Sequence, residues 1–147
     1  VAGVGLWLLL AACSGGVGWF MLFGAGPRHA ADQRTKPAFY PNVEKAALLD
    51  GYIAETSGHS RGATLDLTLT RCERGACVDL DMGTPFDFFD PRANTAHADL
   101  SPAQKANRAR LLDAMARHGF HNYPMEWWHF TFRPEPSPQT AYDVPIQ

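Results

Sequence analysis

The sequence lacks an excess of charge of either sign. Its 147 residues include 13 lysines and arginines and 15 aspartates and glutamates, which gives a net charge of −2 with histidine neutral. Proteins that bind nucleic acid through its phosphates usually carry clustered positive charge, and no run of like charges occurs here. We therefore expect no nucleic-acid partner and favour a small-molecule ligand.

Cysteine is scarce, and the sequence has no Cys-x-x-Cys pair of the kind found in structural zinc sites. Besides Cys13, the cysteines are Cys72 and Cys77, which bracket a predicted hairpin turn, Glu-Arg-Gly-Ala. Such a turn brings the two sulfurs within reach of a disulfide. A disulfide and a pair of reduced thiols both stay open, and only the disulfide indicates an oxidising compartment.

Charged residues are absent from residues 1–27. An uncharged stretch of this length can span a bilayer, and the small residues before Cys13 also fit a bacterial lipoprotein signal. Seven glycines in the first 26 residues weaken a stable helix. A truncated or altered N-terminal part of a buried core is therefore an equal alternative. Membrane association is expected only through residues 1–26, and the compartment stays open between the periplasm or cell envelope and the cytoplasm.

The remaining residues, 28–147, are expected to form one domain, because a chain with 46% hydrophobic residues can bury a core. Alternation of apolar and polar residues from Ala63 to Thr70 predicts a strand whose polar face carries Asp66. The same alternation at residues 78–82 predicts a second strand, which completes a hairpin. The phase of the first strand predicts that Asp66 faces a cleft or solvent.

Helix signals complete the prediction of an α+β fold with a mainly antiparallel sheet. Ser101-Pro102-Ala103-Gln104 predicts a helix with a capping box, ending at Gly119. Asn42 is expected to cap a short helix over residues 43–49. An aromatic-rich segment, residues 125–132, is expected to be the last strand. No internal repeat is visible.

Two of the six histidines lie where a metal site can form. His59 precedes the predicted strand that carries Asp66, and His129 follows Glu126 in the segment Glu-Trp-Trp-His-Phe. Two histidines and one carboxylate are typical protein ligands of a catalytic zinc. Spacing alone is a weak signal, because most domains contain such sets. The other histidines are expected to be structural or solvated: His29, His97, His118 and His121.

Glu126 is available as a carboxylate that accepts a proton from water. Residues three apart in a regular strand face opposite sides of the sheet. Glu126 can therefore share a cavity with His129 only if it lies at the entry of the strand, where Pro124 disturbs the backbone.

Three segments, in order between about Phe39 and Pro145, resemble one peptidase family. They read Ser57-x-His59-x-x-Gly62-x-x-x-Asp66, then Asp81-Met-Gly-Thr-Pro-Phe-Asp-Phe-Phe-Asp90, then Glu126-Trp-Trp-His129-Phe. This combination resembles the zinc D-Ala-D-Ala dipeptidases of the VanX type, part of the wider Hedgehog and D-Ala-D-Ala peptidase-like group.

The resemblance implies a reaction and a role for each residue of the site. It implies hydrolysis of the dipeptide D-alanyl-D-alanine in cell-wall metabolism or glycopeptide resistance. It implies one Zn²⁺ per chain, with the ligands His59, Asp66 and His129. Glu126 is the implied general base and then the acid for the leaving amine. Asp87 is the implied acceptor of the substrate's ammonium group, with Ser57 as a neighbouring hydroxyl contact; by itself, Asp87 fits a turn-capping residue equally well.

The chain departs from the family pattern in two places. Thr64 stands where the family usually has alanine, which adds a hydroxyl on the ligand-bearing face. More importantly, the family carries an Asp-x-Tyr-Arg-Pro element whose arginine stabilises the oxyanion. That element is expected near residues 9–13, where this chain reads Leu-Leu-Ala-Ala-Cys. Loss of one oxyanion donor typically lowers the rate by about 10²–10³.

Three explanations of the missing arginine stay open. The gene is a fragment or has a disturbed reading frame across codons 1–18, or residues 1–26 are a true membrane or lipoprotein segment, or another arginine substitutes. The candidates for substitution are Arg28, Arg34 and Arg61. The alternative function is accordingly a zinc-bound binding module of the same fold without turnover. A weaker alternative is a membrane-anchored protein that acts mainly through its N-terminal segment. The sequence leaves the oligomeric state open.

Overall fold

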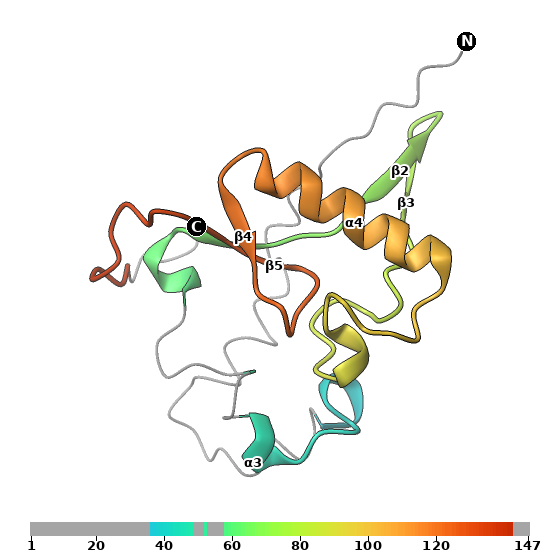
Figure 1. Ribbon diagram of the computed structural model, residues 1–147, viewed down its shortest axis with the longest axis horizontal. Coiled ribbons are helices and arrows are strands. Elements are labelled where there is room, and N and C mark those ends of the chain that lie inside the picture. Colours follow the sequence, from blue (N-terminus) through green and yellow to red (C-terminus); the bar gives the residue numbers. More distant parts are fainter. Residues whose placement is uncertain (1–35, 49–51, 53–57, 143–147) are drawn as a thin grey trace.

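The computed structural model describes residues 36–48, 52 and 58–142, and Figure 1 shows how their elements are arranged. Short antiparallel strands and one long helix are the main regular elements of the described chain, which confirms the predicted α+β class. The elements in chain order are α3 (Lys45–Ala47), the 3-10 turn η2 (His59–Arg61), β1 (Thr64–Asp66), β2 (Thr70–Glu73), β3 (Ala76–Asp79), the 3-10 turn η3 (Pro91–Ala93), α4 (Pro102–Ala116), β4 (Phe120–Asn122) and β5 (His129–Phe132).

A three-stranded antiparallel sheet has the strand order β1-β5-β4. Its central strand β5 pairs with β1 in a register that puts Asp66 directly opposite His129 and Thr64 opposite Thr131. Directly opposed residues in an antiparallel pair have neighbouring side chains. The pairing of the first and last strands therefore brings together two candidate ligands that are distant in the sequence.

The prediction of one continuous strand from Ala63 to Thr70 is wrong. Strand β1 ends at Asp66, and a separate strand β2 starts at Thr70 and pairs with β3 in a second sheet. Between them, Leu67 donates its backbone N–H to the carbonyl of Trp128, whereas the carbonyl of Leu69 accepts from the N–H of Leu80. The chain therefore passes from one sheet to the other within this segment, a change of partner that leaves the alternating pattern intact.

Strands β2 and β3 form the predicted hairpin, which extends away from the three-stranded sheet (Figure 1). Cys72 and Cys77 lie opposite each other in it and form a disulfide. Arg74 and Gly75 both have positive φ, at 52° and 85°. Two such residues are typical of the tight turns whose twist matches that of paired strands.

Helix α4 starts with the predicted capping box. The Ser101 hydroxyl accepts from the backbone N–H of Gln104, and the Gln104 side chain accepts from the backbone N–H of Ser101. Leu111 and Met115 are buried, and the helix ends at Ala116, before Gly119. Its buried face packs on the main core, which contains Tyr40, Leu67, Leu69, Met82, Phe89, Trp127, Trp128 and Phe130.

The predicted cap of the short N-terminal helix is wrong. Helix α3 has Glu44 at its N-cap position, and the Glu44 side chain makes no capping hydrogen bond. The side chain of Asn42 instead donates to Oδ2 of Asp90, far along the chain. Asn42 therefore ties this segment to the loop before η3 through a hydrogen bond to a charged acceptor.

The described residues contain no helix that is both long and apolar enough to cross a membrane. Residues 1–27, for which the membrane, lipoprotein and core alternatives were predicted, lie outside the described part of the chain.

Candidate metal site and catalytic carboxylate

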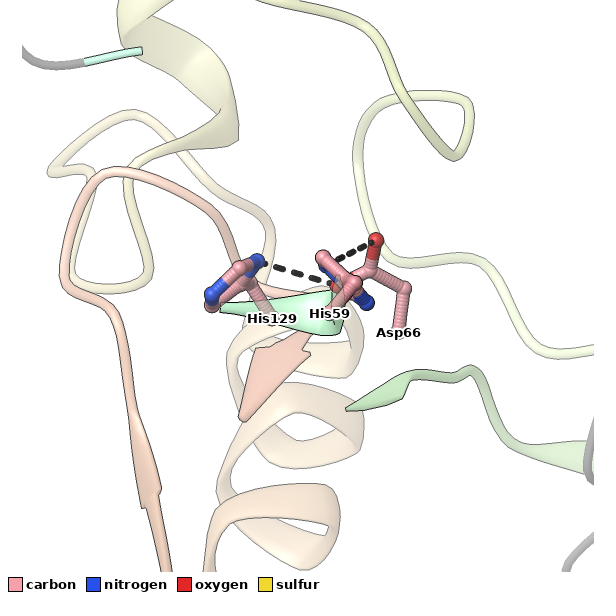
Figure 2. Close-up of side chains that lie close together, drawn as sticks. All are labelled: His59, Asp66 and His129. Carbon is pink, nitrogen blue, oxygen red and sulfur yellow. Dashed lines mark ion pairs between the residues drawn. The ribbon is translucent and has the colours of Figure 1, made fainter. Parts of the chain in front are cut away.

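The side chains of His59, Asp66 and His129 converge at one end of the three-stranded sheet (Figure 2). Each offers one ligand atom, and these atoms all lie within 4.8 Å of one another. Nε2 of His59 lies 3.2 Å from one carboxylate oxygen of Asp66, and Nδ1 of His129 lies 3.1 Å from the other. Among the described residues, these three form the only cluster of histidine, cysteine and carboxylate groups of this kind.

Two glycines shape the turn that carries His59. The 3-10 turn η2 follows Gly58 and ends at Gly62, whose φ of 72° is left-handed. A residue without a Cβ adopts that conformation at little cost. A Cβ on Gly58 would lie 2.6 Å from the hydroxyl oxygen of Thr64. The spacing between His59 and Asp66 thus contains a compact turn, and the histidine reaches Asp66 at the end of β1.

Asp66 is buried, with only 1% of its side chain exposed, so it faces the two histidines and not open solvent. Burial by itself raises the pKa of this carboxyl, but the adjacent imidazoles of His129 and His59 outweigh burial and hold the pKa below its usual value. Oδ1 of Asp66 is shielded from solvent and makes no hydrogen bond of proper geometry. A cation at this point would satisfy it, and two imidazoles with one carboxylate suit zinc and similar divalent metals.

Glu126 is the second buried carboxylate at the site, and its Oε2 lies 3.4 Å from Nδ1 of His129. Burial raises its pKa to about 8, and the charges of Asp66 and Asp87 add to the shift. Its backbone N–H donates to the carbonyl of Tyr123, and its carbonyl accepts from the N–H of His129. Glu126 therefore lies in a turn just before β5, the condition under which it can share a cavity with His129.

Asp87 lies near enough to the site to interact with Asp66 and Glu126. Burial is the main cause that raises its pKa, to about 6, and the charge of Asp66 adds to this effect. Its φ of 57° is left-handed, a conformation that aspartate tolerates better than most residues. The site thus combines three carboxylates with two histidines. Ser57, the predicted neighbouring contact, lies outside the described residues.

Comparison with known proteins shows the family to which the sequence is similar. Residues 17–147 match the peptidase M15 family of D-Ala-D-Ala dipeptidases. The chain belongs to this family.

Several D-alanyl-D-alanine dipeptidases are similar to this family member along most of its length. The one from Enterococcus faecium is 39% identical over 132 residues, which are 89% of this chain and 63% of the relative. The one from Streptomyces coelicolor is 46% identical over 116 residues, 78% of this chain and 56% of the relative. The one from Enterococcus faecalis is 39% identical over 128 residues, 86% of this chain and 61% of the relative. The chain therefore spans roughly three fifths of the length of these dipeptidases.

Thr64, which departs from the dipeptidase pattern, has a partner in the sheet. Its hydroxyl lies 3.1 Å from that of Thr131, the residue directly opposite on β5. Both hydroxyls are satisfied by this pair, so burying Thr64 does not leave an unpaired polar group. The departure is therefore compatible with the ligand pair Asp66 and His129, which lies two residues further along the strands.

Arg61 is the only one of the three proposed arginine substitutes within the described residues, because Arg28 and Arg34 lie outside them. Its guanidinium makes a two-point contact with Glu135, at 2.7 Å from Nε and 3.2 Å from Nη2. A guanidinium held in this fork is committed to its carboxylate. Replacement of the family's oxyanion arginine by Arg61 is therefore disfavoured.

Arg108 is a buried cation whose role was not predicted from the sequence. Its Nε, Nη1 and Nη2 atoms donate to the backbone carbonyls of Met82, Asn94 and Arg92. These bonds fix Met82 on one side of Asp87 and Arg92 and Asn94 on the other, so they hold both ends of the loop that carries Asp87. The helical spacing could have indicated that Arg108 is buried, because it lies one turn from the buried Leu111 on the same face of α4.

Proposed function

We propose that this chain is a zinc-dependent dipeptidase that hydrolyses D-alanyl-D-alanine to free D-alanine, in cell-wall metabolism or glycopeptide resistance. The observation that carries the proposal is the position of buried Glu126, 3.4 Å from His129, beside a His-Asp-His group. Membership of the D-Ala-D-Ala dipeptidase family supports the same reaction and substrate.

In this proposal, His59, Asp66 and His129 hold one Zn²⁺ per chain. When bound, the ion supplies Lewis acidity, which polarises a carbonyl oxygen and lowers the pKa of water to about 7. Asp66 contributes negative charge to the ligand set, and its two imidazole neighbours already favour its ionised form. The buried surroundings strengthen these electrostatic interactions by limiting access of water.

Glu126 acts on the proton of the attacking water. Without a cation, its pKa is raised to about 8 by burial and by the charges of Asp66 and Asp87. A positive charge nearby lowers the pKa of a carboxyl, so Glu126 is ionised and basic when the site is loaded. It accepts one proton as the water attacks the peptide carbonyl and delivers it to the leaving amine, so the proton count balances.

Asp87 is proposed to receive the ammonium group of the substrate. Its carboxylate adds to the negative charge of Asp66 and Glu126, and a substrate ammonium would relieve their mutual repulsion. Such a contact favours peptides with a free amino end. The proposed partner is accordingly a small dipeptide, and no nucleic acid or other macromolecule is needed.

The alternative proposal is a zinc-bound binding module that does not turn over. Two observations favour it: the sequence has no arginine before Arg28, and the guanidinium of Arg61 is paired with Glu135. If no arginine faces the oxyanion, the expected loss is about 10²–10³ in rate.

The deciding experiment measures zinc content and release of D-alanine from D-alanyl-D-alanine by the purified chain. We expect one bound Zn²⁺ and measurable hydrolysis, with a loss of about 10²–10⁴ in kcat in Glu126→Ala and retention of its metal. His59→Ala should lose both the metal and the activity. His97→Ala, which alters a histidine outside the metal group, is the matched control and should behave as the parent.

Each negative result has a separate meaning. One equivalent of bound zinc without hydrolysis contradicts the dipeptidase and leaves the binding module. A chain that binds no zinc contradicts both.

A further inference from the structure

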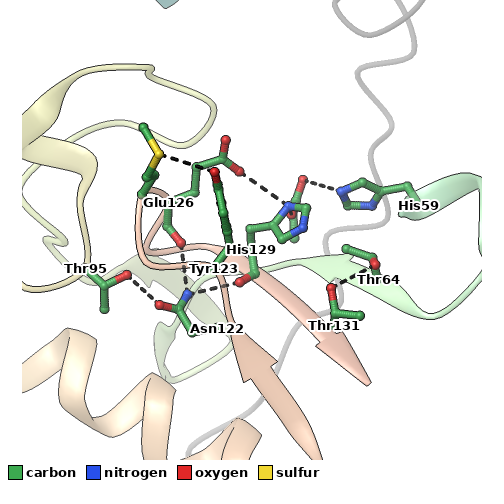
Figure 3. A network of polar contacts seen from close by, with 10 residues as sticks. His59, Thr64, Thr95, Asn122, Tyr123, Glu126, His129 and Thr131 are labelled. Carbon is green, nitrogen blue, oxygen red and sulfur yellow. Dashed lines mark hydrogen bonds and ion pairs between the residues drawn. The ribbon is translucent and has the colours of Figure 1, made fainter. Parts of the chain in front are cut away.

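The side chain of Asn122, at the end of β4, bridges the proposed general base and a proposed metal ligand (Figure 3). Its Nδ2 donates to the backbone carbonyl of Glu126 at 2.9 Å and to that of His129 at 3.0 Å. Its Oδ1 accepts a 2.6 Å hydrogen bond from the hydroxyl of Thr95. One amide group therefore joins both ends of the turn that carries the two functional side chains.

The orientation of this amide follows from the chemistry of its partners. The carbonyls of Glu126 and His129 can only accept hydrogen bonds, so the nitrogen of Asn122 must face them. The Thr95 hydroxyl can donate, and it occupies the opposite side of the amide. All three contacts are satisfied in this orientation and in no other, which makes the amide a rigid link.

Backbone hydrogen bonds also shape this turn, and one of them runs from the N–H of Glu126 to the carbonyl of Tyr123 at 3.1 Å. The N–H of His129 reaches the carbonyl of Glu126 at 3.3 Å, a long hydrogen bond, whereas the N–H of Tyr123 reaches the carbonyl of His129 at 2.9 Å. Thr95 also donates its backbone N–H to the carbonyl of Pro124 at 2.9 Å. Thr95 thus supports the turn twice, once directly and once through Asn122.

The proposed function requires the side chains of Glu126 and His129 to stay close to each other. Glu126 and His129 lie three residues apart and would face opposite sides of a regular strand. They meet at 3.4 Å because the turn redirects Glu126. Small errors in the placement of catalytic groups lower rates considerably, and hydrogen-bonded partners of metal ligands often change metal affinity or activity by about 10–100-fold.

We propose that Asn122, oriented by Thr95, is the positioning residue that sets Glu126 against His129 and the metal. Its effect on turnover rests on the dipeptidase function proposed above, whereas its effect on metal affinity requires only the His-Asp-His group. The amide contacts the carbonyls of Glu126 and His129 and the hydroxyl of Thr95, so it acts through the backbone of the turn.

The test compares Asn122→Ala and Asn122→Asp with the parent chain. Asn122→Asp keeps the shape but places an oxygen against the two carbonyls. We expect kcat to fall about 10–100-fold and zinc affinity, measured by competition with a chelator, to weaken about tenfold, with KM within about threefold. Thr95→Val, which removes the hydroxyl without changing the shape, should produce a smaller loss in the same direction. Thr95→Ser, which keeps the hydroxyl, should have the same kcat and zinc affinity as the parent.

A control separates positioning from general stability. Ser101→Ala removes the capping hydrogen bond of α4, away from the turn, and should lower the thermal unfolding temperature without altering zinc affinity or kcat. If the Asn122 variants fail to fold, the comparison of Thr95→Val with Thr95→Ser decides the proposal, because both changes are small.

Zinc affinity and kcat within twofold of the parent in the folded Asn122 or Thr95→Val variants would overturn the proposal. If the parent binds zinc but does not hydrolyse the dipeptide, the proposed function fails. The positioning role is then tested by zinc affinity alone. Tenfold weaker binding in Asn122→Ala then supports it, and equal binding overturns it.

Discussion

Glu126 shows how the environment of one residue sets its chemistry. The carboxyl is buried and lies near the charges of Asp66 and Asp87, so its neutral form is favoured as long as no cation is present. A cation in the His-Asp-His group would reverse that preference. At the scale of this residue, the proposed function therefore makes metal binding and activation of Glu126 as a base the same electrostatic event.

The raised pKa of Glu126 predicts that the metal-free protein loses stability as the pH rises. The pKa is about 8 in the folded chain against 4.5 for an ordinary glutamate. Between these values the folded state keeps a proton that the unfolded state releases, so the free energy of unfolding falls with increasing pH. The loss should reach the order of a few kcal/mol at pH 8. Glu126→Gln should remove it.

Thermal unfolding with a chelator at pH 5 and pH 8 checks this. The stability advantage of Glu126→Gln over the parent should grow from the lower to the higher pH. Added zinc should turn this advantage into a disadvantage. Asp99→Asn, which alters a carboxylate with 92% side-chain exposure, is the control. An advantage that does not change with pH would show that Glu126 titrates normally in the folded chain.

At the scale of elements, η2 depends on contacts made far along the chain. A single 3-10 turn has poor hydrogen-bond geometry and little stability of its own. The segment after β5 supports this turn through the fork between Arg61 and Glu135 and through the backbone N–H of Tyr142, which donates to the carbonyl of Ser60. The position of His59 is therefore coupled to residues that follow the last strand.

Weakening this fork should weaken metal binding. Arg61→Lys loses the two-point geometry, and Glu135→Gln loses the charge. We expect each to weaken zinc affinity by about 2–10-fold, because His59 becomes less well placed. Calorimetric titration with Zn²⁺ measures the effect. Arg117→Lys, in an exposed pair with Asp113, is the matched control, and equal zinc affinities in all three variants would rule out the coupling.

At the scale of the whole molecule, the described strands form two separate sheets. The three-stranded sheet carries the site, and the hairpin β2–β3 extends away from it (Figure 1). All four residues of β3 are exposed, including Val78 at 64% exposure. The disulfide between Cys72 and Cys77 holds this hairpin together without touching the site.

Removal of the disulfide should therefore lower stability but leave metal binding unchanged. The loop between the two cysteines is short, so the chain-entropy contribution is about 2 kcal/mol. We expect the double variant Cys72→Ser with Cys77→Ser to unfold at a lower temperature and to bind zinc with the affinity of the parent. Denaturation and zinc titration of both proteins test this, and a weaker zinc affinity would show that the hairpin supports the site.

Local features of the fold could be predicted from the sequence. The capping box of α4 forms as expected, since Ser101 and Gln104 are neighbours in the chain. The hairpin turn between the two cysteines also depends on residues within a short span. The continuous strand after Ala63 is wrong, because the alternating pattern does not record that β1 and β2 take different partners.

For the candidate site, the sequence by itself determined the residue types and the short spacing between His59 and Asp66. The tertiary structure decided that β1 lies against β5, which puts Asp66 opposite His129. It also decided that Arg61 pairs with Glu135 and that Asn122 links Glu126 to His129. Periodicity and caps reflect interactions between near neighbours, whereas strand pairing and buried side-chain contacts depend on how the whole core closes.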